Sequence, residues 1–420
     1  MNFLPIATRL RAAFSLRRNL RALFTPPSGH LRPLDGLRAL SILWVALFHA
    51  GFYSIWYIPT PAYATLLLSP WMLPVWRGDF GVDVFFVLSG FLVAGMVLDE
   101  RAKTGRLRLG LFQLRRFLRT WPALAVALGV DLLLFRDNPD VAWANLVYVS
   151  NFVSVAHVCM GWTWSLSIEE QFYVLCPWLL RAVSPFGTAR RLLALTAVAT
   201  GFILLGGYVV VTRGYFPFDA DIVINRPLDR WIVAFDDLYT KPWMRAGPLL
   251  AGVASAVAYR DPRVMPALSR ARVGAAAGFV IAVALAIVAM HWPIVHMAPR
   301  PFEVAYLASY RTAFGVATAY VMLFSVSGHP LGRRLGRLLS TRLLYPIGQL
   351  AYSAYLLNPM ITTLVHRALA SPVAGHGWPP MLVFVPLDVT GTFLAALVLH
   401  LTIERPFLAL RPRSPASRGT

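Results

Sequence analysis

About ten apolar stretches, each long enough to cross a bilayer, recur along the chain and leave little room for any other architecture. A helix needs about 20 mostly apolar residues to cross roughly 30 Å of hydrocarbon, and there every backbone polar group must be satisfied within the protein. The chain is therefore predicted to be an all-α, polytopic integral membrane helical bundle. We place its spans at 38–57, 80–98, 117–135, 164–182, 192–212, 243–259, 273–291, 304–325, 343–365 and 381–401.

Segment 143–160 is apolar as well, but polar residues interrupt it. These are Ser150, Asn151, Ser154 and His157. Such a pattern suits a short interfacial or re-entrant helix better than a further span, because lipid offers no partner for the polar groups. An additional span here would also invert the sidedness of every later loop.

The basic residues give the predicted orientation. Lys and Arg concentrate on the cytoplasmic side of a membrane protein. Of the 39 Lys and Arg residues, 29 fall on one side if both termini are cytoplasmic. The inner segments that hold them are 1–38, 99–119, 181–191, 260–272, 328–342 and 402–420. We accordingly predict a basic cytoplasmic arm at 1–33, a membrane domain at 34–407 and a basic cytoplasmic tail at 408–420.

The net charge of +20 does not indicate a nucleic-acid partner. Only 14% of the residues are charged and 57% are hydrophobic, whereas a soluble domain has about a quarter of its residues charged. The basic residues lie between apolar runs and not on a soluble face, so anionic membrane lipids are their expected partners. With two cysteines and no clustered ligand pattern, no metal site is expected either.

Arg38 and His49 are the first candidate site residues, because charge inside a bilayer is costly and usually functional. Eleven residues advance a helix by roughly 16 Å and return to nearly the same face. Arg38 would then lie at the cytoplasmic mouth and His49 near mid-membrane, where a general base could meet a long ligand with a phosphorylated head. A snorkelling Arg and a His bonded to a carbonyl would fit the same spacing.

Arg116 and Arg119 lie three residues apart on one helix face, in LRRFLRTWPAL. Guanidinium groups bind phosphates in a bidentate manner, so the pair is a candidate for a phosphorylated co-substrate. Taken alone, the two residues would also fit the ordinary positive flank of a span.

Five further charged residues lie within predicted spans. Glu169 and Glu170 are adjacent and point about 100° apart, so that one could face the bundle interior and help a catalytic base. Asp83 must find a partner, and an ion pair with an Arg of a neighbouring span is as acceptable as a catalytic role. Arg245 and Arg311 are predicted to face the interior as supporting residues.

Six strings in order resemble the acyltransferase 3 family of integral membrane O-acyltransferases, which includes O-antigen and exopolysaccharide acetylases. They extend from about Leu34 to Phe407 and read LDGLRALSILWVALFHA, GVDVFFVLSGFL, LRRFLRTWPAL, WSLSIEEQFY, AYSAYLLNP and IERPF. Two more strings, YTKPWMRAGPLLAG and SYRTAFGV, look like the branch that includes the nose-resistant-to-fluoxetine proteins.

The resemblance implies transfer of an acyl group, acetyl by expectation, from acyl-coenzyme A to a hydroxyl of a carbohydrate or lipid-linked glycan. It implies a bacterial inner membrane location, acyl-coenzyme A as co-substrate and no tightly bound cofactor. His49, Arg38, Glu169 and Glu170 then become the candidate catalytic residues. Arg116 and Arg119, together with Arg38, become the co-substrate contacts. The soluble extension of some polysaccharide acetylases is lacking, so an unseen protein partner could receive the acyl group.

Two other readings of the sequence stay open. A lipid or glycolipid transporter or flippase could line its path with the same buried charges, although transporters usually show internal repeats and none is detected here. A membrane-bound O-acyltransferase of the type built on an Asn and a deep His could use Asn358 and His366.

Overall fold

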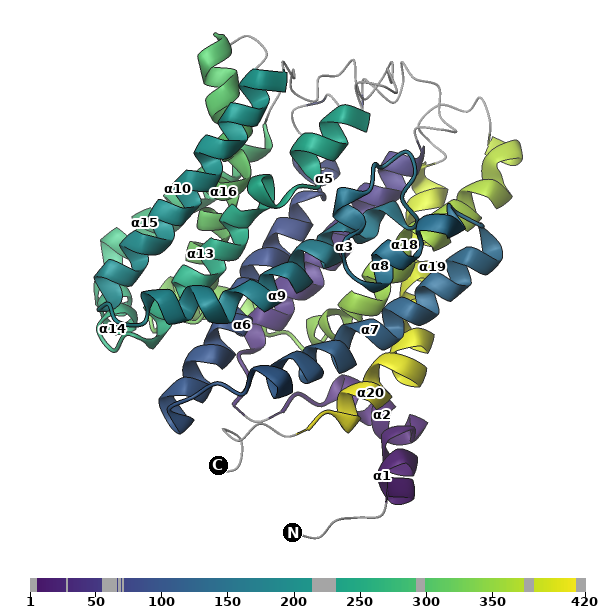
Figure 1. Cartoon of the computed structure of the whole chain (residues 1–420), viewed down its shortest axis with the longest axis horizontal. Coiled ribbons are helices and arrows are strands. Elements are labelled where there is room, and N and C mark those ends of the chain that lie inside the picture. The colour runs from purple at the N-terminus through teal and green to yellow at the C-terminus, as the bar shows by residue number, and fades with distance from the viewer. Residues whose placement is uncertain are drawn as a thin grey trace.

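The computed structural model describes residues 6–27, 29–54, 66, 69, 72–213, 232–291, 299–373 and 381–412, and over these it is helical without strands. Each predicted span overlaps a long helix (Figure 1), and residues 55–57 of the first predicted span lie outside the described residues. These helices are α3 (Arg32–Ser54), α6 (Phe80–Thr104), α7 (Leu109–Leu134), α9 (Trp164–Val183), α10 (Thr188–Arg213), α13 (Pro242–Arg260), α15 (Arg272–Met290), α16 (Arg300–Ser325), α18 (Leu344–Val373) and α19 (Met381–Leu399).

Six of the described helices are long and apolar enough to cross a membrane on their own. They are α3, α6, α7, α10, α15 and the stretch Met381–Leu410. A seventh results if α16 and α17 (Pro330–Leu339), which meet at a bend of 99°, form one span. The chain is therefore a multi-pass helical membrane protein, while the count of ten spans and the cytoplasmic termini stay predictions.

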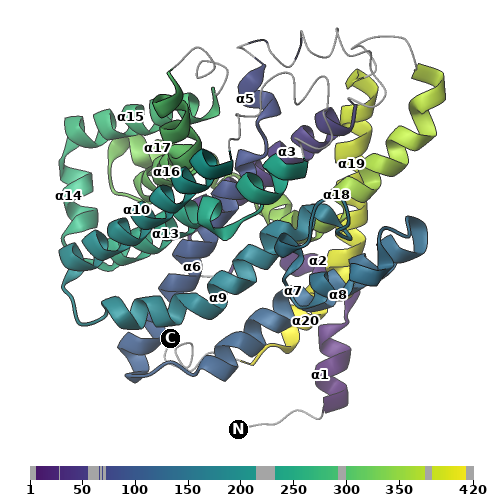
Figure 2. The same ribbon diagram turned by 45° about the horizontal axis from the view of Figure 1, so that its top comes forward.

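Helix α6 holds the bundle together, because it packs against α3 and α9 as well as against α13 and α16 (Figure 2). Gly90 of α6 and Gly252 of α13 face each other so closely that a Cβ on either would collide with backbone of the other helix. Such small residues let two membrane helices approach, and they bring the polar groups of α6 and α13 within ion-pair distance. On the other side, α3 packs along α18 and α19.

The N-terminal arm forms two short helices, α1 (Ile6–Ala13) and α2 (Leu16–Phe24). They lie against the C-terminal end of the chain, η6 (His400–Glu404) and α20 (Arg405–Leu410). The Asn19 amide nitrogen ties them down by donating to the carbonyls of Ala13 at 2.9 Å and Leu401 at 3.3 Å.

The prediction of one helix over residues 143–160 is wrong, because only the first four of these residues form an α-helix. The chain instead forms short turns, α8 (Trp143–Leu146) and the 3₁₀ turns η1 (Pro139–Val141), η2 (Ser150–Phe152) and η3 (Gly161–Thr163). Asn145 explains the difference, because its side-chain amide donates to the Cys159 carbonyl at 2.7 Å and to Thr163 Oγ1 at 2.8 Å. Side chains that bond loop backbone in this way compete with a regular helix.

Candidate functional site

Polar side chains join α3 to α18 at three levels along the bundle. Near the start of α3, the Gln349 amide donates to Asp35 Oδ1 at 3.3 Å. Further along, His49 Nδ1 lies 2.5 Å from Asn358 Oδ1. At the far end of α3, Ser54 Oγ lies 2.9 Å from His366 Nε2. We call these three contacts the polar seam.

The middle contact of the seam determines which nitrogen of His49 is free to react. The Asn358 amide nitrogen donates to Thr392 Oγ1 of α19 at 3.1 Å, which orients the amide and turns its oxygen toward His49. An amide oxygen only accepts, so His49 Nδ1 must carry the proton. In the neutral ring Nε2 is then the acceptor, the atom that a general base uses. His49 is partly exposed, whereas Asn358 is fully buried.

The predicted arginines gather at the same end of the bundle as Asp35. Arg38 of α3 interacts electrostatically with Arg119 of α7 and with Glu169 of α9. Arg116 lies with its guanidinium 4.8 Å from the centre of the Tyr173 ring and interacts electrostatically with Arg119 as well. The structure thus brings together Arg38, Arg116 and Arg119, which come from two helices.

Arg411, just beyond α20, belongs to this group although its sequence context did not single it out. Burial and the neighbouring charges of Arg119 and Arg116 lower the pKa of Arg411. Arg38 has an ion-pair partner at 3.4 Å, Asp35 Oδ1. Arg116, Arg119 and Arg411 have no ion pair within 4.0 Å among the described residues. We call Arg38, Arg116, Arg119 and Arg411 the arginine cluster, and its repulsion favours binding of an anion.

The two glutamates of α9 face different neighbours, as their adjacency predicted. Glu169 accepts hydrogen bonds from Ser89 Oγ at 2.9 Å and from the Tyr173 hydroxyl at 2.8 Å. Glu170 accepts one from Thr120 Oγ1 at 2.9 Å. Both lie beside the arginine cluster, and the described residue that hydrogen-bonds His49 is Asn358 and not a glutamate.

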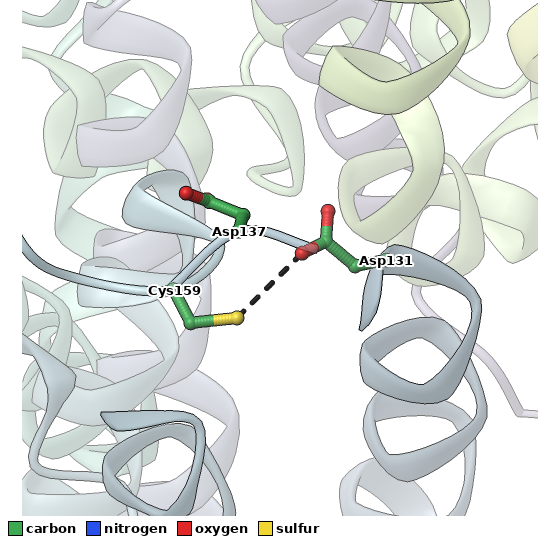
Figure 3. A group of neighbouring side chains, drawn as sticks. All are labelled: Asp131, Asp137 and Cys159. Atoms are coloured by element: carbon green, nitrogen blue, oxygen red, sulfur yellow. Dashed lines mark hydrogen bonds between the residues drawn. The ribbon is translucent and has the colours of Figure 1, made fainter. Parts of the chain in front are cut away.

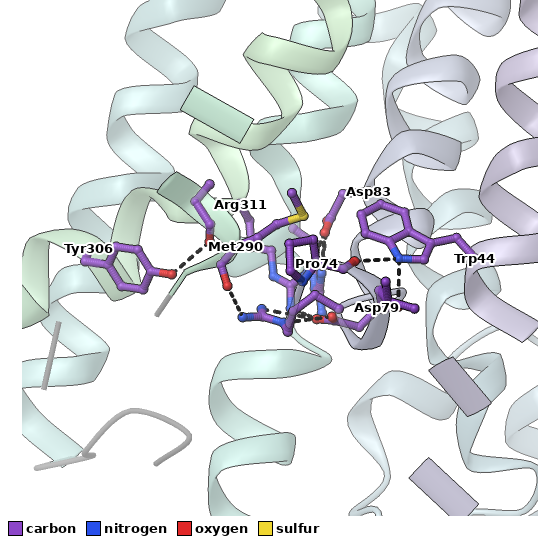
Figure 4. A network of polar contacts seen from close by, with 11 residues as sticks. Trp44, Pro74, Asp79, Asp83, Met290, Tyr306 and Arg311 are labelled. Carbon is purple, nitrogen blue, oxygen red and sulfur yellow. Dashed lines mark hydrogen bonds and ion pairs between the residues drawn. The ribbon is translucent and has the colours of Figure 1, made fainter. Parts of the chain in front are cut away.

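The charges in α6, α13 and α16 and just before α6 form a network of ion pairs (Figure 4). Asp83 is fully buried and accepts from Arg245 Nη1 at 2.9 Å and from Arg311 Nη1 at 2.6 Å. Arg311 also forms an ion pair with Asp79, which Arg77 Nε contacts at 3.0 Å. Of the two roles considered for Asp83, the structure shows the ion pair, and it also places Arg245 and Arg311 in the interior. We call this set the ion-pair network.

One group of potential metal ligands was not recognised in the sequence. Asp131, Asp137 and Cys159 place a ligand atom each within 4.8 Å of one another (Figure 3). Cys159 Sγ lies 3.6 Å from Asp131 Oδ2 as a weak donor, and Asp137 accepts from the Met160 amide at 3.3 Å. Burial raises the pKa of the Cys159 thiol to about 12, which favours the neutral thiol over the thiolate that binds metals. Cys159 and Asp131 thus contact each other while Asp137 is hydrogen-bonded elsewhere, and we assign the group no ion.

Comparison with known proteins identifies the family. A family model described as an acyltransferase domain matches residues 32–400. The chain belongs to the acyltransferase 3 family. This domain includes the polar seam and all of the arginine cluster except Arg411.

Three relatives show how broadly this acyltransferase 3 domain is distributed. Nose resistant to fluoxetine protein 6 of Caenorhabditis elegans is 24% identical over 90% of this chain and 50% of its own length. Regulator of hypoxia-inducible factor 1 of the same animal is 24% identical over 94% of this chain and 83% of its own length. A Staphylococcus aureus (strain COL) protein named as a candidate O-acetyltransferase is 34% identical over 35% of this chain and 24% of its own length. The chain thus spans about half the length of the first relative, and no solved structure matches it significantly.

Proposed function

We propose that this acyltransferase 3 protein transfers an acyl group, acetyl by expectation, from acyl-coenzyme A to a hydroxyl of a cell-envelope carbohydrate or lipid-linked glycan. The observation that carries the proposal is the arrangement of α3. It holds a cation of the arginine cluster near one end and, eleven residues further, a histidine whose Nε2 is free to accept a proton.

The donor would bind at the arginine cluster. Coenzyme A carries phosphate groups at one end of a long arm and the thioester at the other. Arg116, Arg119 and Arg38 would hold the phosphates, with Arg411 as an additional contact, because guanidinium groups match phosphate oxygens in pairs. The arm would then run along α3 toward His49, over roughly 16 Å of helix.

The chemical step would take place at His49. Nε2 would remove the proton from the acceptor hydroxyl as that oxygen attacks the thioester carbonyl, and the proton would leave with the coenzyme A thiol. Such a step contributes about 10²–10⁴-fold in rate. Asn358 would hold the ring in the required tautomer. An acyl-histidine formed on the same nitrogen is the ping-pong variant of this step.

Glu169 and Glu170 would act next to the donor and not on His49 directly. Both lie beside the arginine cluster, where they would limit the repulsion among its arginines before the donor binds. Their hydrogen bonds to Tyr173, Ser89 and Thr120 would fix them on the α6 and α7 side of the site.

The proposed orientation has ten spans, both termini in the cytoplasm and a bacterial inner membrane as host. Helix α2 supports it, because exposed Leu16, Leu20 and Phe24 accompany Arg17, Arg18 and Arg21. Exposed apolar and basic side chains on one short helix suit the interface of an anionic leaflet. The donor site would then open to the compartment that contains coenzyme A.

The test is transfer of label from radiolabelled acetyl-coenzyme A to the envelope glycans of the host by purified protein. Wild type and the control His157→Ala, at an exposed loop histidine, should label glycan. A folded His49→Ala should be slower by about 10²–10⁴-fold. Equal rates in His49→Ala and wild type would exclude His49 as the base. Glycolipid movement across vesicles without any thioester consumption would instead favour the transporter.

A further inference from the structure

The contact of the polar seam at the far end of α3, between Ser54 and His366, has the residue types of a second reactive site. Ser54, His366 and Asp388 come from α3, α18 and α19, and each is fully buried. Ser54 Oγ lies 2.9 Å from His366 Nε2, and His366 Nδ1 lies 3.6 Å from Asp388 Oδ2. The His366 ring stacks on Phe384 with 4.3 Å between ring centres, which fixes its plane.

Hydrogen bonding sets the direction in which a proton can move here. His366 Nδ1 lies 2.8 Å from the Thr362 carbonyl, which only accepts, so Nδ1 carries the proton. Nε2 of the neutral ring is then an acceptor, and the Ser54 hydroxyl can donate to it. A serine whose proton points at an imidazole nitrogen is the arrangement of an activated nucleophile and its base. The Ala50 carbonyl, 2.7 Å from Ser54 Oγ, is the alternative acceptor that a helical serine uses.

Asp388 distinguishes this contact from an ordinary bond between helices. Neither of its carboxylate oxygens has a hydrogen-bond partner among the described residues, although the side chain is fully buried. A buried carboxyl group without such partners is costly within a membrane protein. A positive charge formed transiently on His366 would be stabilised by this carboxylate, as in serine hydrolases.

We propose that Ser54 is a covalent acyl carrier, with His366 as its base and Asp388 as the group that stabilises the protonated ring. The proposal rests on the proposed function and adds an intermediate to it. Five residues separate His49 from Ser54, a helical rise of roughly 7.5 Å. The same five residues turn the helix by about 140°, so the thioester has to move further along α3 from His49 before its carbonyl comes within about 3–3.5 Å of Ser54 Oγ, the distance at which atoms react.

The two half-reactions balance without another reactant. In the first, Ser54 Oγ attacks the thioester carbonyl and its proton passes to His366. The C–S bond breaks, and the coenzyme A thiolate leaves with the proton that His366 holds. In the second, the acceptor hydroxyl loses its proton to neutral His49 and attacks the Ser54 ester. The ester C–O bond breaks, and the Ser54 oxygen takes that proton from protonated His49.

The experiment omits the acceptor, so that an acyl-enzyme accumulates. Purified full-length protein is incubated with radiolabelled acetyl-coenzyme A, quenched in acid, and mapped by peptide mass spectrometry. Wild type should carry one acyl group per chain on the peptide that contains Ser54, and added envelope glycan should remove it. The label should be absent in Ser54→Ala. In His366→Gln it should form about 10²–10⁴-fold more slowly.

Two controls separate chemistry from folding. Ser41→Ala alters a buried serine of the same helix whose hydroxyl bonds the Leu37 carbonyl at 2.7 Å, and it should label like wild type. Ser54→Cys keeps a nucleophile and should carry the acyl group as a thioester. Glycan transfer that survives Ser54→Ala but is lost in His49→Ala would overturn the acyl-serine and leave the proposed function standing. Absence of transfer by wild type would overturn the proposed function itself.

Discussion

The arginine cluster and the ion-pair network are both groups of charges inside the bundle, yet they differ in burial and in pairing. Arg116 of the cluster is buried and its three other members are partly buried. In the network, Asp83 receives Arg245 and Arg311, and Arg311 also reaches Asp79. In the cluster, Arg38 forms an ion pair with Asp35 at 3.4 Å. The three other arginines of the cluster form no ion pair within the described part of the chain. Charge inside the bundle alone therefore does not indicate a ligand site, whereas several neighbouring arginines without ion pairs are the better candidate for an anion site.

The aromatic surroundings of the two groups reinforce this contrast. Arg311 lies 4.1 Å from the centre of the Phe80 ring, and Arg245 lies 4.2 Å from that of Tyr239. Rings and carboxylates together surround these cations, although Arg245 Nη2 and Arg311 Nε have no hydrogen-bond partner among the described residues. Arg116 lies beside the rings of Tyr173 and Phe112, and among the described residues its side-chain acceptor is the Met96 sulfur at 3.5 Å, a weak one. A phosphate oxygen would be a far better partner for it.

The largest expected effect comes from opening the ion-pair network. Arg311→Gln removes the cation that pairs with both Asp79 and Asp83, so each of these buried carboxylates loses one positively charged partner. Breaking one partner of a buried pair costs about 3–5 kcal/mol, so we expect a strong loss of folded protein. The loss is measured as the difference in free energy of unfolding between the purified variant and wild type in detergent.

The matched control is Arg260→Gln, which removes a peripheral ion pair to Asp99, a side chain that is 51% exposed. Exposed pairs contribute about 0–1 kcal/mol, so this variant should unfold like wild type. If both variants lost the same small amount of stability, the ion-pair network would not stabilise the fold more than an exposed ion pair does.

A smaller effect should follow when His49 loses its orienting partner. Asn358→Ala removes the amide that holds Nδ1–H, and misplacement of a reacting group can lower the rate by about 10²-fold. We expect kcat to fall by roughly 10- to 100-fold while KM for acetyl-coenzyme A stays unchanged.

Thr363→Ala is the control for this variant. It alters the same helix, where the hydroxyl bonds only the Pro359 carbonyl at 2.8 Å among the described residues. Its kcat should match that of wild type. A rise in KM in Asn358→Ala without a change in kcat would place Asn358 in donor binding instead.

The smallest effect concerns Cys159, and it tests whether this thiol is as inaccessible as the buried charges of the ion-pair network. Burial raises the pKa of this thiol to about 12, so the reactive thiolate is about 10⁻⁴ of the total at pH 8. Iodoacetamide should therefore alkylate Cys159 far more slowly in the native protein than in the unfolded chain. The native rate should rise as the pH approaches 12, as mass spectrometry can follow. Alkylation at the unfolded rate at pH 8 would show that the group is open.

The long helices could be predicted because an apolar stretch of span length has few alternatives. Segment 143–160 could not, because the side chain that replaces helical hydrogen bonds, Asn145, reaches residues 14 and 18 positions away. No local pattern encodes such contacts. The two helices of the N-terminal arm depend in the same way on their packing against the C-terminal end.

The candidate site was predictable to the extent that it depends on spacing along one helix. A spacing of eleven residues predicts that Arg38 and His49 lie along one face of a helix. A spacing of three residues predicts the same for Arg116 and Arg119. Asn358 as the partner of His49 was missed, since 309 residues separate the two. Arg411 was assigned to a basic tail, because its burial against α7 arises only from the fold.

Binding of coenzyme A to purified protein tests the central claim most directly. Each charge-assisted contact contributes about 1.5–3 kcal/mol, so Arg116→Gln and Arg119→Gln should each weaken binding by roughly 10- to 100-fold. Arg106→Gln, at an exposed arginine in the loop before α7, should bind like wild type. Wild-type affinity in the double variant Arg116→Gln/Arg119→Gln would contradict the account, because the arginine cluster would then not be the donor site.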